Sequence, residues 1–109
     1  MARGVNRGEI WLYTFKRPDK RRPVVVLSRQ NVLAFMRTVI VAPITSTIRG
    51  IPSEVLVGVE EGLKAPSAVK LDNVQAVEQS GLHAFVGSLS RDKMRDVCRA
   101  LAVATGCDP

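Results

Sequence analysis

The chain has 109 residues, of which 46% are hydrophobic, and its formal net charge is +6. That length suits one domain over residues 1–109 with one hydrophobic core, and the longest apolar runs, residues 24–27 and 39–44, are too short to span a bilayer, so we expect no membrane partner. Residues 1–50 hold ten basic and two acidic side chains, whereas residues 51–109 hold six and eight, so the basic half favours nucleic acid or an acidic peptide as partner over a merely solvated surface.

The N-terminal segment predicts a strand and a charged turn. Residues 1–11 contain charges but no apolar segment typical of a secretory signal, so we expect a cytoplasmic protein. Residues 8–15, GEIWLYTF, alternate apolar and aromatic side chains and predict a first strand. Residues 16–22, KRPDKRR, include Pro18-Asp19 and indicate a turn.

The next segment predicts two further strands. Residues 23–28, PVVVLS, are almost entirely apolar, which predicts a strand at the centre of the sheet. Residues 29–37 are too mixed for a strand and predict a short helical turn or a loop. Residues 38–45 predict a third strand, which ends in the hydroxyl cluster Thr45-Ser46-Thr47.

The second half adds short strands and then changes period. Four more strands are predicted over residues 53–59, 67–72, 74–78 and 84–89, and residues 60–66 indicate a loop. Apolar side chains then recur at helical spacing between Ser90, a suitable N-cap, and Gly106, a suitable C-cap. We therefore expect a mainly β fold: a small antiparallel barrel or strongly curled sheet of about seven short strands, with short helical segments and a C-terminal α-helix.

The usual catalytic reagents are scarce. The only histidine, His83, is expected at the surface, and no paired carboxylates stand at metal-binding spacing. Cys98 is expected to pack as a small apolar residue and Cys107 belongs to the tail, so the two thiols make no zinc site. No glycine-rich phosphate loop is present, and we expect neither metal nor cofactor.

Arginines and hydroxyls at strand ends are the remaining candidates. Arg22 opens the second strand and Thr45 closes the third, and antiparallel pairing would bring them to the same rim of the sheet. A guanidinium binds phosphate through two parallel hydrogen bonds, and a threonine hydroxyl donates to a phosphate oxygen. Each residue alone is equally compatible with an ordinary surface role, so the hypothesis rests on their convergence.

Five sequence blocks resemble the MazF/PemK-type toxins of bacterial toxin–antitoxin modules. They are RGEIW (7–11), RRPVVVLS (21–28), VAPITSTIRG (41–50), SEV (53–55) and LDNVQAV (71–77), in the family's order and spacing. The resemblance runs from about Arg7 to Gly106. It implies an SH3-like, PemK-type barrel that works as a homodimer and cuts single-stranded RNA without a metal ion, leaving a 2′,3′-cyclic phosphate and a 5′-hydroxyl.

The resemblance also assigns roles to residues. It implies that Arg22 stabilises the phosphate or takes part in proton transfer, that Thr45 donates a hydrogen bond in the transition state, and that Ser46 assists. The first loop is shorter than in several members, and Asp19 is its only carboxylate, so either Asp19 substitutes for the usual acid or this chain works without it. Trp11 is open to two interpretations, base stacking or, more simply, core packing.

Partners follow from the same resemblance and from charge. Family antitoxins end in an acidic, flexible segment that folds onto the toxin, and a basic groove would accept either that segment or RNA. Asn73 and Gln75 are candidates to read base edges, although strand-end polar residues are common. The residues expected to contact RNA are Lys16, Arg17, Lys20, Arg21, Ser28, Thr47, Arg49, Asn73 and Gln75.

Two rival functions stay open at this point. A non-catalytic nucleic-acid-binding SH3-like module needs only the basic charge. A toxin of the same fold that poisons gyrase would use the C-terminal helix, whose exposed side chains are basic rather than apolar, which argues against an ordinary protein-docking surface.

Overall fold

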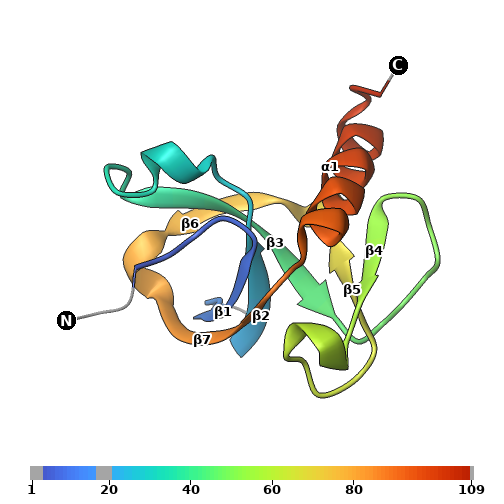
Figure 1. Cartoon of the computed structure of the whole chain (residues 1–109), viewed down its shortest axis with the longest axis horizontal. Coiled ribbons are helices and arrows are strands. Elements are labelled where there is room, and N and C mark those ends of the chain that lie inside the picture. The colour runs from blue at the N-terminus through green and yellow to red at the C-terminus, as the bar shows by residue number, and fades with distance from the viewer. Residues whose placement is uncertain (1–3, 17–20, 109) are drawn as a thin grey trace.

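In the computed structural model, which describes residues 4–16 and 21–108, seven strands form one curled sheet that is followed by an α-helix (Figure 1). The elements are β1 (Glu9–Thr14), β2 (Arg21–Val26), β3 (Thr38–Thr45), β4 (Glu54–Val57), β5 (Ser67–Lys70), β6 (Gln75–Glu78), β7 (Leu82–Ser88) and α1 (Arg91–Thr105). The prediction of a mainly β fold with a C-terminal helix is confirmed.

β3 is the strand that connects the sheet. The strand order is β4-β5-β3-β2-β1-β7, all neighbours are antiparallel, and β6 also pairs with β3. β2 lies along one edge of β3, while β6 pairs with its first half and β5 pairs with Ile44 and Thr45 near its end. Eight residues make β3 long enough to hold three partner strands.

β2 is central, as its apolar sequence predicts. Val24, Val25 and Val26 are completely buried. Because side chains alternate between the faces of a strand, Val25 belongs to the core that includes the helix residue Val97, whereas Val24 and Val26 pack with Trp11 in a second core. A strand covered on both faces has no place for a polar side chain, which explains the run of valines.

The C-terminal helix has the expected caps. Ser90 accepts a hydrogen bond from the Lys93 amide (3.1 Å), and Gly106 adopts the left-handed conformation at φ 73°. Val97 and Ala100 face inward, and the helix packs against β4 and the 3₁₀ turn Leu71–Asn73. Within the described residues, no helix is long and apolar enough to cross a membrane.

One expectation about the helix is wrong. Cys98 is exposed rather than packed, because the adjacent Val97 occupies the inward position and the next residue turns about 100° away. Its sulfur accepts a hydrogen bond from the Arg7 guanidinium (3.4 Å). His83 is exposed, as expected, and shares a hydrogen bond with Thr14 (3.2 Å).

Several strand boundaries differ from those predicted. β2 begins at Arg21 and ends at Val26, so Leu27 and Ser28 lie beyond the strand. β4 ends at Val57, because residues 59–61 form a 3₁₀ turn that closes at Gly62 with φ 97°. Residues 71–73 also form a 3₁₀ turn rather than the end of β5, and β7 begins at Leu82 rather than at residue 84.

Candidate active site

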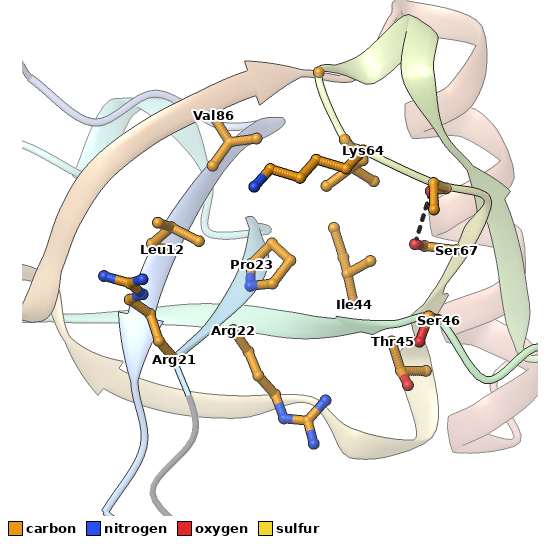
Figure 2. Close-up of a pocket in the computed structure, with 13 residues that line it drawn as sticks. Leu12, Arg21, Arg22, Pro23, Ile44, Thr45, Ser46, Lys64, Ser67 and Val86 are labelled. Atoms are coloured by element: carbon orange, nitrogen blue, oxygen red, sulfur yellow. Dashed lines mark hydrogen bonds between the residues drawn. The ribbon is translucent and has the colours of Figure 1, made fainter.

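A pocket of about 560 Å³ opens where β2 begins and β3 ends (Figure 2). β1, β7 and the loop between residues 61 and 67 complete its wall. Its charged and hydroxyl-bearing lining residues are Arg21, Arg22, Thr45, Ser46, Lys64 and Ser67. Its volume lies within the range of roughly 300–1,000 Å³ that is usual for ligand sites.

Strand pairing brings Arg22 and Thr45 to this pocket. The β2–β3 ladder ends with the pair Val24 and Pro43, and Arg22 and Thr45 each lie two residues beyond that pair, at the same end of the ladder. Both side chains line the pocket, and Figure 2 shows the Arg22 guanidinium and the Thr45 hydroxyl on the same side of it. The juxtaposition predicted from sequence is therefore present, while the chemical role of the two residues stays a prediction.

The local hydrogen bonds leave both groups able to donate. The Thr45 hydroxyl oxygen accepts the backbone amide of Thr47 (3.1 Å), so its own hydrogen is not used by that bond. Arg22 is half-buried, and no hydrogen bond or ion pair links its guanidinium to the residues that the structure describes. A cation and a hydroxyl donor with unused capacity suit an anionic ligand such as a phosphodiester.

The loop that follows Thr45 is held by a buried carboxylate. Glu54, whose side chain is 2% exposed, accepts hydrogen bonds from the amides of Arg49 (3.1 Å) and Gly50 (3.0 Å) and from the Lys70 ammonium (2.8 Å). The Lys70 hydrogen bond lowers the pKa of Glu54; burial opposes this, and the two amides reinforce it. Glu54 thus anchors the segment that leaves the pocket.

The loop between β4 and β5 closes over the pocket because its backbone touches β7. A Cβ atom at Gly62 would collide with the Val86 carbonyl, and one at Gly87 would collide with the Glu61 carbonyl. The Glu61 carboxylate accepts the Gly58 amide (2.6 Å), which fixes the start of the loop. This close approach places Lys64 at the pocket.

Other residues expected to contact RNA lie apart from the pocket. Thr47, Arg49, Asn73, Gln75 and Lys16 are exposed but do not line it.

Ser28 and Trp11 are both buried inside the protein. Ser28 is buried, and its hydroxyl accepts the Ile40 amide (2.8 Å), so the structure does not bring it to the pocket. Trp11 is only 5% exposed, packs edge-on against Phe85 and donates to Glu9 (3.0 Å), which supports core packing over base stacking. Arg17, Asp19 and Lys20 lie outside the described residues.

Lys64 is the charged pocket residue that sequence reasoning missed, and Ser67, at the start of β5, is the hydroxyl-bearing one. Residues 60–66 indicated only a loop, and nothing in them shows which surface the loop covers. The one available signal was that Lys64 stands between Gly62 and Pro66, because these two turn residues restrict the direction of the chain on either side of the lysine.

Comparison with known proteins gives consistent matches over the whole fold. The family model described as PemK-like, MazF-like toxin of type II toxin-antitoxin system matches residues 6–105. A Mycobacterium tuberculosis protein named Probable endoribonuclease MazF5 is 43% identical over 104 residues, covering 93% of each chain. Endoribonuclease MazF3 of the same species is 38% identical over 90 residues, covering 83% of this chain and 87% of that protein.

Solved structures agree with these relatives. The Mycobacterium tuberculosis toxin MazF-mt6 superposes with a TM-score of 0.86 at 34% identity, covering 93% of this chain and 99% of that one. A mycobacterial endoribonuclease solved in complex with its cognate antitoxin also has a TM-score of 0.86, at 23% identity, covering 97% and 99%. The second match, at that identity, shows the likeness of the fold.

Proposed function

Because this chain belongs to the family of PemK-like, MazF-like toxins of type II toxin–antitoxin systems, we propose that it is an endoribonuclease that cuts single-stranded RNA without a metal ion. The observation that carries the proposal is that Arg22 and Thr45 line one pocket and that both have hydrogen-bond donors not used within the described residues. Its relatives MazF5 and MazF3 bear the name endoribonuclease.

The reaction requires little chemistry from the protein, because RNA brings its own nucleophile. The 2′-hydroxyl loses its proton and its oxygen attacks the adjacent phosphorus. The bond to the 5′-oxygen of the next nucleotide then breaks, and that oxygen takes up a proton. The products are a 2′,3′-cyclic phosphate and a 5′-hydroxyl.

Arg22 and Thr45 act on the charge that develops during this attack. The phosphorane has more negative charge on its non-bridging oxygens than the substrate, so donors fixed beside it stabilise the transition state more than the ground state. A guanidinium stays protonated in proteins and is therefore a poor proton shuttle, so the main role of Arg22 is electrostatic. Thr45 donates its hydroxyl hydrogen, Ser46 assists from the next position, and Asp19 is the candidate acceptor of the 2′-proton.

The pocket also suits the regulation that the family name implies. An acidic, flexible segment of a cognate antitoxin would bind the same cations as the RNA, and inhibition would follow from competition. The toxin would act in the cytoplasm as a homodimer, and its physiological outcome would be arrest of translation and growth.

The deciding experiment is RNA cleavage in the presence of excess EDTA. Purified protein at micromolar concentration is incubated with a long single-stranded RNA, and the ends of the fragments are analysed. Fragments with 5′-hydroxyl and cyclic phosphate ends are expected. RNA that is bound but stays intact would instead assign the chain to the non-catalytic nucleic-acid-binding modules.

A further inference from the structure

The pocket contains two cationic groups that the cleavage chemistry does not use, Arg21 and Lys64. Lys64 lies in the loop after Glu61, and its side chain extends across the pocket with the ammonium towards Leu12 and Val86 (Figure 2). The Arg22 guanidinium and the Thr45 hydroxyl lie on the other side of the pocket. Among the described residues, none forms a hydrogen bond or an ion pair with the Lys64 ammonium.

The surface below Lys64 is apolar. Leu12, Pro23 and Val86 are half-buried pocket residues from three different strands, and Ile44 lies beside them at 2% exposure. These side chains give a nonpolar floor next to the phosphate-binding groups. The flat face of a nucleobase is stabilised by contact with such a surface, while the edge of the base carries hydrogen-bonding groups.

We propose that Lys64 reads the base of one nucleotide next to the scissile phosphate and selects a keto base, guanine or uracil. This inference rests on the proposed ribonuclease function. An ammonium has three donors and no acceptor. It therefore pairs with O6 and N7 of guanine or a carbonyl of uracil, whereas adenine and cytosine present an amino group where those bases carry a keto oxygen.

A base fits this position better than a second backbone phosphate does. A phosphate placed over Leu12 and Val86 would give up its water to an apolar surface, and burial of a charge without full hydrogen bonding is costly. A base placed there covers apolar surface and offers a neutral acceptor to the ammonium. The rigid approach of Gly62 to β7 holds the loop backbone, so the distance between Lys64 and the cleavage groups is set by the fold.

The test is the cleavage of a pool of single-stranded RNA with a randomised segment, in which the fragment ends are sequenced. The variants are Lys64→Gln and Lys64→Glu. Lys93→Gln is the matched control, because the Lys93 ammonium donates to the Leu56 carbonyl (2.7 Å) and does not line this pocket.

For the wild-type protein and Lys93→Gln we expect the same enrichment of guanine or uracil at one position beside the cut. Lys64→Gln should reduce that preference by about tenfold, the order expected for one charged base contact. Lys64→Glu should move the preference towards adenine or cytosine, because a carboxylate accepts from their amino groups.

The other outcomes overturn the inference in distinguishable ways. An unchanged base profile in both Lys64 variants, or an equal drop in rate at every site, would show that Lys64 does not read a base. A wild-type preference for adenine or cytosine at all positions beside the cut would contradict the selection rule. If the wild-type protein cuts no RNA, the proposed function fails instead.

Discussion

Among the described residues, charged side chains lie near both ends of the segment between β3 and β4, but only those at its second end are paired with each other. At its start, beside Thr45, the cations Arg22 and Lys64 line a pocket and form no ion pair with the described residues. At its end, Glu54 and Lys70 are paired at 2.8 Å with side chains that are 2% and 16% exposed. The paired charges stabilise the position of the loop, whereas the unpaired ones stay available for an anion that the chain itself does not provide.

The largest effect should come from removal of the Thr45 hydroxyl. Thr45→Ala is expected to slow RNA cleavage by about a hundredfold or more, as is typical for loss of one transition-state donor, while the melting temperature changes little. Thr38→Ala is the matched control, since Thr38 is an exposed residue at the other end of the same strand. A Thr45→Ala protein that cuts at the wild-type rate would show that the Thr45 hydroxyl is not a donor in the transition state.

A smaller effect should come from salt. If Arg21 and Arg22 contact RNA phosphates, the slope of log affinity against log salt is about −1.4 for a single strand. Affinity should then fall roughly sevenfold between about 50 and 200 mM salt. Thr45→Ala protein is suitable for this titration because the RNA stays intact, and a flat response would show that the unpaired cations are not the binding groups.

The smallest effect, on stability rather than on cleavage, should come from the Glu54–Lys70 pair. The pKa of Glu54 is lowered in the folded state, mainly by the Lys70 hydrogen bond. Its contribution to stability is therefore complete above the usual glutamate pKa of about 4.3 and is lost as pH falls from there through the lower folded value. Glu54→Gln should lower the melting temperature at pH 7 and flatten its decline in acid.

Glu60→Gln provides the control for that measurement, because Glu60 is exposed and no hydrogen bond or ion pair with the described residues holds its carboxylate. Folded Glu54→Gln protein should still cut RNA at neutral pH, since Glu54 positions a loop and touches no substrate. An acid decline as steep as that of the wild-type protein would mean that the buried pair does not set the pH dependence of stability.

Local patterns in the sequence predict most of the fold. A run of apolar and aromatic side chains marks β1, an unbroken apolar run marks β2 as central, and the caps Ser90 and Gly106 mark the helix. Strand ends are less predictable, because a glycine such as Gly58 or a 3₁₀ turn competes with the ladder for the same backbone groups. Cys98 shows the limit of such prediction for a helix, because a residue one position away from the buried one already faces solvent.

The site was predictable where strand pairing alone decides it. Arg22 and Thr45 stand at the start and end of successive strands, so antiparallel pairing brings them to the same end of the β2–β3 ladder. Lys64 was not predictable, because its position depends on the contact of Gly62 with β7, which no local pattern encodes. Ser28 was expected to contact RNA, but the Ile40 amide uses its hydroxyl inside the protein.

The pairing of β3 with three strands makes the location of the threonine hard to alter. A slip of one residue along β3 would turn Thr45 to the opposite face of the sheet and present a neighbour in its place. Such a slip would have to disrupt the ladders to β2, β5 and β6 at the same time. Insertions near β3 are therefore tolerable only in the connecting loops. Variation among related proteins should change the residues around the Thr45 hydroxyl and leave the position of the hydroxyl unchanged.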